Sequence, residues 1–362
     1  MSLKLGVARL LVVVSAALVL GEILARLVLT SPSVQTFDPA LGYANLPHSR
    51  TFQSREGFQH LILNGLGLND REIGLKPAGG ERVLFIGDST TFSAQVARPD
   101  NFTSRLEAMT PGLDAVNAGR DALGPQQWAA MLDRLEKPVS PDAVVFVMSR
   151  GDAFDLQEAR TTIAHDPAGR PLSVRYAEGH EEGLQKALGP LLRRSALVTY
   201  LARRGQSVLT DTQTGDSWIG RLSRHGGGSA VRRNSAADDL DADRVALQLA
   251  DIMRLVSQNR RAAFVYVPSF IYGPDGQMTY EHRSLLERPV IARAARLAGV
   301  PLIDLSPDFA AAYRQTGRPL TGFNTSKLGE GHLNTYGHTV VAQALHRRLV
   351  PLLGSPAAGA QN

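Results

Sequence analysis

A serine at the end of an apolar run is the residue best placed for nucleophilic chemistry. The run Val83–Ile86 leads directly into Gly87, Asp88 and Ser89. A serine at the carboxyl end of a buried strand, where a helix begins, exposes its hydroxyl to the cleft, and the amides at the helix start face a developing oxyanion. The G-x-S-x-G elbow does not fit, because Thr91 stands at its last glycine. A helix N-cap is the alternative role for Ser89.

Two further positions carry similar signals, each weak by itself. The second apolar run, Ala115–Ala118, ends at Gly119, where the missing side chain lets the backbone approach a ligand and turn an amide into the cleft. Near the end of the chain, His332 stands in the stretch GHLNTYGH, directly before an apolar helical pattern. A histidine there can reach back to the edge of the sheet. The plainer alternatives are a strand-ending glycine and a surface histidine.

Taken in order, these stretches resemble the SGNH, or GDSL, hydrolase family, in its membrane-anchored bacterial branch. The resemblance is carried by VLFIGDSTTF, then VNAG, then GHLN before the last helix, with FDPALGY and ILNGLGLNDREIG upstream. It implies ester hydrolysis without a cofactor, with Ser89 as nucleophile and His332 as its base. It also implies that the amides of Ser89 and Gly119 form part of an oxyanion hole. Asp88 would order the loop rather than react.

The chain departs from that family at two positions. Gly151 stands where the family has an asparagine that completes the oxyanion hole, and Arg150 is the neighbouring candidate to replace that donor. Loss of one such donor costs roughly 10²–10³ in rate in other hydrolases. Gly329 stands where the family has the triad aspartate, three residues before the histidine. We expect Glu330, one residue closer, to supply the carboxylate through a shifted loop, with a water or a backbone carbonyl as the alternative.

Short apolar runs alternate with helical patterns, which predicts an α/β fold. The expected architecture is a flavodoxin-like three-layer arrangement with a five-stranded parallel sheet and the site at the carboxyl edge of that sheet. Besides the two runs above, the expected strands are Ala143–Met148, Ala263–Val267 and Pro301–Leu305, and the expected helices are Asp241–Gln258, Leu285–Leu297 and Tyr336–Leu349.

Around that sheet the chain divides into an extended wrapping segment at 31–81, the hydrolase-like domain at 82–353, an insertion within it at 154–235, and a disordered tail at 354–362. We interpret the insertion as a lid or partner surface over the active edge, with a helix near Glu181–Arg204. From Arg160 to Arg233 it carries twelve Lys and Arg against six Asp and Glu. This charge indicates either a solvated helical face or contact with an anionic polymer or membrane surface.

The first thirty residues form a targeting segment. Two basic residues precede the apolar stretch Leu10–Leu29, which has about the 20 residues that a bilayer requires. Glu22 and Arg26 interrupt it four residues apart, so they can pair along one face, near the outer interface or against a partner helix. By the positive-inside rule, a single-pass anchor in the inner membrane would leave the domain in the periplasm. A cleaved signal peptide and a buried soluble helix are the alternatives.

Composition limits the chemistry further. The 362 residues include no cysteine, which excludes disulfide scaffolds, Cys-ligated zinc, iron–sulfur clusters and a cysteine nucleophile. The net charge of +5 is small for this length and does not indicate nucleic-acid binding. His332 and His338 lie six residues apart without clustered carboxylates nearby, which is a poor spacing for a metal site.

Three functions are compatible with the resemblance. The first is a membrane-anchored ester hydrolase that acts on small esters or on O-acyl groups of a secreted or cell-wall glycan through an acyl-Ser89 intermediate. The second is a polysaccharide O-acetyltransferase that receives its acyl group from a membrane partner protein. The third is a catalytically weak domain used for binding or assembly, and its motivation is the glycines at positions 151 and 329.

Overall fold

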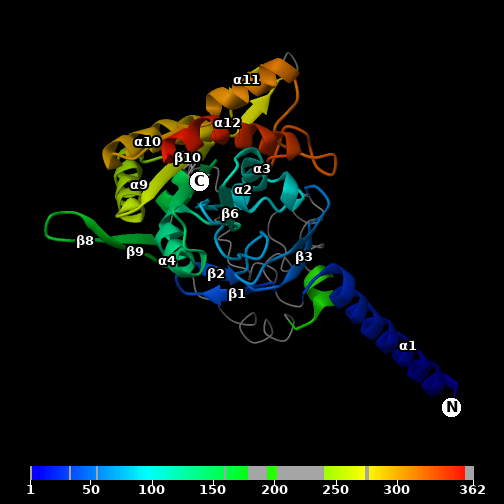
Figure 1. Ribbon diagram of the computed structural model, residues 1–362. Helices are drawn as coiled ribbons and strands as arrows, with labels where there is room; N and C mark the ends of the chain where they lie inside the picture. The colour runs from blue at the N-terminus through cyan, green and yellow to red at the C-terminus, as the bar shows by residue number, and fades with distance from the viewer. Residues whose placement is uncertain are drawn as a thin grey trace.

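The computed structural model describes residues 2–31, 34–53, 56–158, 160–177, 194–201, 240–273 and 277–354. Within them lie a long N-terminal helix, small two-stranded pairs and a three-layer α/β domain (Figure 1). Most of the predicted insertion, including most of the helix predicted near Glu181–Arg204, lies outside the described residues. The predicted tail also lies outside them, except for Gly354.

Five parallel strands form the centre of the domain, in the order β13-β10-β7-β5-β6. Renumbered along the chain, this is the flavodoxin-like order 2-1-3-4-5. The strands are β5 (Glu81–Gly87), β6 (Leu113–Gly119), β7 (Ala143–Ser149), β10 (Arg261–Val267) and β13 (Leu302–Asp304). Each overlaps one of the predicted apolar runs, so the predicted fold class is confirmed.

Helices cover both faces of this sheet, because alternate residues of each strand point to opposite sides. Leu84 and Ile86 of β5 belong to the core on one side, whereas Val83 and Phe85 belong to the core on the other. The first side carries α4 (Trp128–Val139), α9 (Ala242–Ser257) and α10 (His282–Ala298); the second carries α3 (Phe102–Met109), α11 (Ser306–Thr316) and α12 (Thr335–Leu353). The helices α9, α10 and α12 were predicted from their apolar patterns.

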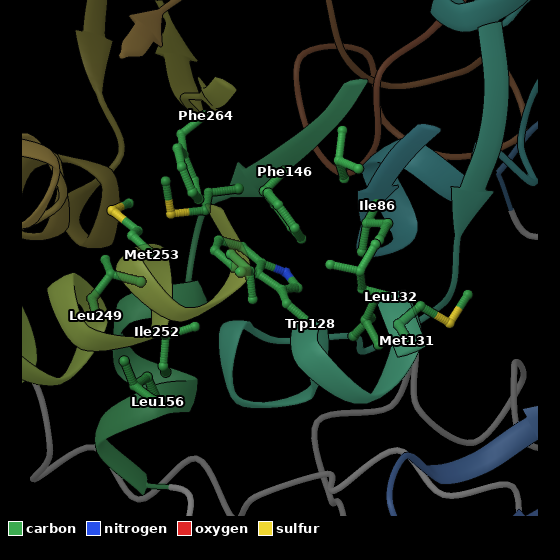
Figure 2. Close-up of a cluster of buried hydrophobic side chains, with 14 of the residues drawn as sticks. Ile86, Trp128, Met131, Leu132, Phe146, Leu156, Leu249, Ile252, Met253 and Phe264 are labelled. Carbon is green, nitrogen blue, oxygen red and sulfur yellow. The ribbon is translucent and has the colours of Figure 1, made fainter. Parts of the chain in front are cut away.

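An aromatic cluster lies at the centre of the first core (Figure 2). The Trp128 ring of α4 lies 5.0 Å from the ring of Phe146 on β7 and 5.9 Å from the ring of Phe264 on β10. The two phenylalanine rings are stacked, with centroids 5.3 Å apart. All three side chains are fully buried, so they join the helix layer to the middle of the sheet.

Short elements connect these layers. They are α2 (Ser89–Phe92), η2 (Arg98–Asp100), η3 (Pro125–Gln127), α5 (Asp152–Glu158), β11 (Phe270–Tyr272) and β12 (Met278–Tyr280). The segment that precedes the domain forms two antiparallel pairs, β1 (Gln35–Asp38) with β2 (Gly42–Asn45) and β3 (Arg50–Gln53) with β4 (Gln59–Ile62).

The described part of the insertion contains strands that the sequence did not predict. β8 (Arg160–His165) and β9 (Pro171–Ala177) form a hairpin around a turn that begins at Asp166. Its half-buried Ile163 and Val174 pack against the core under α9, and His165 bonds to Asp251 of that helix at 2.9 Å. Partial burial of single residues gives a weaker sequence signal than a continuous apolar run.

The N-terminal helix projects away from the domain (Figure 1). It comprises α1 (Ser2–Leu24) and the π-helical turn η1 (Ala25–Leu29). The stretch Gly6–Leu29 has a mean hydropathy of 2.3, is long enough to cross a membrane and has no buried share in its apolar window. The buried soluble helix considered above is therefore wrong, whereas a membrane span and a signal sequence both fit these properties.

Replacing Trp128 with Ala is expected to lower the free energy of unfolding by about 3–5 kcal/mol, because it leaves a cavity between α4 and the sheet. Trp128→Phe keeps an aromatic ring against Phe146 and should cost clearly less. Urea unfolding of the detergent-solubilised chain measures both values. Equal losses for the two variants would contradict the packing role of the ring.

Candidate active site

Ser89 lies at the carboxyl edge of the sheet, where β5 ends and α2 begins. Asp88 is the N-cap of α2: its carboxylate accepts the amide of Thr90 and the hydroxyl of Ser149. Burial raises the pKa of Asp88. Because Ser89 is the first residue of α2, its backbone N–H has no carbonyl acceptor within that helix. As expected, Asp88 orders the loop, and Ser89 is free to present its hydroxyl.

His332 reaches that hydroxyl from the far end of the chain. Its Nε2 lies 3.0 Å from Oγ of Ser89. The loop that carries it is fixed by Asn334, the N-cap of α12, whose side-chain oxygen accepts the amide of Gly337 and whose side-chain NH₂ group donates to the carbonyl of Pro319. The predicted serine–histidine pair is therefore formed at the predicted edge of the sheet.

The carboxylate that orients His332 is Glu56, in the connection between β3 and β4. Its Oε2 accepts both the ring Nδ1–H of His332, at 2.8 Å, and the backbone amide of the same residue, at 2.9 Å. Because an ionised carboxylate only accepts hydrogen bonds, the ring proton lies on Nδ1 and leaves Nε2 as the acceptor for Ser89. Ser89, His332 and Glu56 thus form a continuous hydrogen-bonded triad.

Two opposing effects set the basicity of His332. Burial of the ring lowers its pKa, but the hydrogen bond and the charge of Glu56 outweigh this, with smaller contributions from Asp121 and Asp88. The pKa of His332 therefore lies above its ordinary value. A base of this kind is well matched to proton transfer from a serine near neutral pH.

Glu330 is not the triad acid, which corrects the sequence-based expectation. Its side chain is 63% exposed and forms an ion pair with Lys327. The expected aspartate position, Gly329, has a φ of +87°, and a Cβ there would lie 3.1 Å from the Tyr272 ring. A side chain at 329 is therefore disfavoured by both backbone conformation and space.

The amide of Gly119 has a different partner from the one expected. It donates to the side-chain oxygen of Asn117 at 2.9 Å rather than to a group at Ser89. A Cβ at Gly119 would lie 2.0 Å from the backbone nitrogen of Phe92, so the glycine lets β6 approach α2 closely. The predicted oxyanion role of Gly119 is thus replaced by a packing role that positions the serine turn.

The turn after β7 also differs from expectation. The amide of Gly151 donates to both carboxylate oxygens of Glu287, at 3.0 and 2.9 Å, and Arg150 pairs with Glu281 at 3.4 Å. Neither residue directs its donor to Ser89 in the way that an oxyanion role requires. Of the predicted oxyanion donors, the amide of Ser89 remains a candidate, because it lies at the start of α2 and has no acceptor within that helix.

Buried carboxyl groups surround that turn. Glu287 also accepts the hydroxyl of Tyr266 at 3.0 Å, and burial raises its pKa to about 8. Burial, together with the charges of Asp88 and Asp155, raises the pKa of Asp152 well above its ordinary value. Burial and the charge of Glu158 raise the pKa of Asp155 to about 6. Burial and mutual repulsion thus disfavour the charged forms of these carboxyl groups.

Among the described residues, no group of three or more His, Asp or Glu side chains is arranged so that it could hold a metal ion. His338 lies within α12, fully buried, with its ring stacked on Phe102 at 6.0 Å. It therefore faces the second core rather than His332.

Sequence reasoning missed Glu56 because the residue lies in a short loop without periodicity, 276 residues from its partner. One signal was present: the absence of a carboxylate at position 329 implied that it came from elsewhere. A second is Gly331, beside the histidine. It has a φ of +79°, and a Cβ there would lie 2.7 Å from Oε1 of Glu56, so this glycine makes room for the carboxylate.

Replacing Glu56 with Gln is expected to lower kcat for a simple acetyl ester by about 10²–10⁴. His332 accepts a proton only in its neutral form, so activity rises with pH through the pKa of this residue. Removing the negative charge lowers that pKa and should move the acidic limb of the pH–rate profile to lower pH. Glu330→Gln is the matched control and should keep both rate and profile. An unshifted profile in Glu56→Gln would contradict the triad.

Glu287 is expected to make stability depend on pH. Its pKa rises from 4.5 in the unfolded chain to about 8 in the folded one, so its stabilising contribution is complete below pH 4.5 and is lost as the pH rises through 8. The unfolding free energy should therefore fall between pH 5 and pH 8 more steeply in the wild type than in Glu287→Gln. Identical slopes in urea unfolding would refute this.

No family profile and no curated protein sequence matches the chain. Similar solved structures include a member of the lipolytic G-D-S-L family from Veillonella parvula DSM 2008, with 12% identity, coverage of 75% of this chain and 99% of that one, and a TM-score of 0.40. The acetyl xylan esterase AlAXEase has 16% identity, coverage of 73% and 97%, and a TM-score of 0.38. A variant of Axe2, an acetyl-xylooligosaccharide esterase from Geobacillus Stearmophilus, has 14% identity, coverage of 77% of this chain and 97% of that one, and a TM-score of 0.36.

The chain's own features match what its resemblance to the SGNH hydrolases implies. The sheet has the expected strand order, the GDS turn lies at the carboxyl edge, and Ser89 contacts His332 across that edge. The chain therefore has a three-layer α/β fold with the flavodoxin-like strand order, and its GDS and GHLN motifs resemble those of the SGNH/GDSL hydrolases.

Proposed function

We propose that this protein hydrolyses ester bonds through a covalent acyl-Ser89 intermediate. The observation that carries the proposal is the unbroken contact from Ser89 Oγ to His332 to Glu56, with heavy-atom distances of 3.0 and 2.8 Å. Such a triad activates a hydroxyl that is otherwise a weak nucleophile at neutral pH. It stands at the carboxyl edge of an open parallel sheet, where α/β proteins bind ligands.

The geometry supports a two-step reaction. Ser89 Oγ attacks the acyl carbon while His332 Nε2 takes the hydroxyl proton, and the amide of Ser89 donates to the oxyanion that forms. The C–O bond to the alcohol then breaks, and the alcohol leaves with the proton from His332. Water then attacks the acyl carbon while His332 takes one of its protons; the bond from the acyl carbon to Ser89 Oγ breaks, His332 returns the proton to Oγ, and the carboxylic acid departs. Glu56 keeps the ring oriented and stabilises its cationic form throughout.

We infer that the substrate is a small O-acyl group, such as an acetyl ester, on a secreted or cell-wall glycan. The proposed location is the periplasmic side of the inner membrane, with α1 as a single-pass anchor. The exposed apolar surface of α1 supports the anchor, and Lys4 and Arg9 before the span support a cytoplasmic N-terminus.

Transfer of the acyl group to a sugar hydroxyl would use the same serine and histidine, and only the acceptor would differ. In that case a membrane partner protein would supply the acyl group. A catalytically weak binding domain had two motivations, and one of them no longer applies, because Glu56 provides the carboxylate missing at position 329.

The purified chain is expected to hydrolyse a simple acetyl ester and to react at Ser89 with a fluorophosphonate probe. Ser89→Ala should abolish both the turnover and the labelling, because it removes the nucleophile. Turnover that persists unchanged in Ser89→Ala would overturn the proposal. In a second assay, an ester with a labelled acetyl group is mixed with glycan: label released as free acetate supports hydrolysis, and label on the glycan supports transfer.

A further inference from the structure

A short piece of the insertion, residues 194–201, lies against the last turns of α1. The side-chain carboxylate of Glu22 accepts the hydroxyl of Ser195 at 2.6 Å and the backbone amides of Ala196 and Leu197 at 2.9 Å each. These amides belong to the start of a helical turn that covers residues 196–201. A carboxylate at the start of a helix satisfies amides that have no partner within that helix.

Two further contacts fix the same segment to the anchor helix. Arg26 bonds to Glu22 at 2.6 Å, as its spacing predicted, and also donates to the carbonyl of Arg194 at 2.6 Å. A Cβ at Gly21 would lie 3.2 Å from the end of the Leu197 side chain, so Leu197 packs where α1 has no side chain. The expected partner helix of the Glu22–Arg26 pair therefore comes from this chain itself.

The thickness of a bilayer indicates at which depth in the membrane these contacts with α1 would lie. Its hydrocarbon core is about 30 Å thick, which corresponds to about 20 helical residues. The apolar stretch Leu10–Leu29 has this length, so Glu22 and Arg26 lie within its last eight residues, toward the outer end of the span. The segment 194–201 is held at that level.

The outer surface of the segment is apolar. Val198 and Leu201, three residues apart on one face of the helical turn, are 37% and 56% exposed. In the sequence, the uncharged stretch SALVTYLA is bounded by Arg193 and Arg194 on one side and by an arginine pair at 203 and 204 on the other. Apolar residues bordered by arginines are typical of segments that lie in a membrane interface and contact anionic headgroups.

We propose that residues 194–201 form a second membrane contact, which lies in the outer interface of the bilayer beside α1. Val198 and Leu201 enter the boundary between headgroups and acyl chains. The proposal rests on the membrane anchoring of α1 and is independent of the ester chemistry. Two points of contact hold the domain in one orientation, whereas a helix alone would let it rotate about the helix axis.

The absence of native cysteine makes the test direct. Full-length Val198→Cys and Leu201→Cys variants carry an environment-sensitive fluorophore and are reconstituted into vesicles of phosphatidylcholine and phosphatidylglycerol with nitroxide-labelled lipids. Leu172→Cys on β9, which is 60% exposed, is the matched control for an exposed leucine away from α1, and Val14→Cys reports insertion of α1. We expect shallow nitroxides to quench positions 198 and 201 several-fold more than position 172, and deep nitroxides to quench position 14.

Equal quenching at 201 and 172, with position 14 quenched, would overturn the second contact. Absence of quenching at position 14 would overturn the anchor on which it rests. Shielding of position 201 in native membranes but not in protein-free vesicles would assign the surface to a protein and overturn the lipid assignment.

Combining Glu22→Gln with the probe at 201 should reduce its quenching at least several-fold while position 14 stays inserted, because the variant loses the carboxylate that holds the segment. Ester turnover in detergent should stay at the wild-type rate in this variant.

Discussion

The hydrogen bond between His332 and Glu56 is the interaction on which the site depends. Without it, the ring has no fixed tautomer, and the contact with Ser89 at 3.0 Å is only a proximity. The bond joins a loop before the last helix to a hairpin that precedes the first strand of the sheet. Several local features serve this bond: Gly331 leaves space for the carboxylate, and Asn334 fixes the loop that carries the ring.

The β3–β4 hairpin links this site to the anchor. Arg50, the first residue of β3, donates to the backbone carbonyls of Arg26 and Leu27, where the apolar helix ends. The connection to β4 then carries Glu56 to the triad. The segment between the apolar helix and the sheet therefore contacts the end of that helix through Arg50 and the candidate site through Glu56.

The surroundings of Ser89 differ from the expected oxyanion arrangement. The amides of Gly119 and Gly151 are bonded to Asn117 and Glu287, so they stabilise the two turns that flank the serine rather than face it. Behind the second turn, burial and mutual repulsion raise the pKa values of Asp152 and Glu287. Among these groups, His332 with Glu56 is the pair whose geometry suits a base for Ser89.

The sequence by itself determined the sheet and indicated Ser89 and His332 as the candidate nucleophile and base. Continuous apolar runs such as Val83–Ile86 predict buried parallel strands, and GDS and GHLN are local patterns whose chemistry depends on neighbouring residues. Only the tertiary structure brought Glu56 to His332, because the two residues lie 276 positions apart and the residue types around them do not identify the partner. It also decided the partners of Gly119, Gly151 and Glu330, since which acceptor an amide finds, and which donor a carboxylate finds, depends on loop geometry and not on residue type.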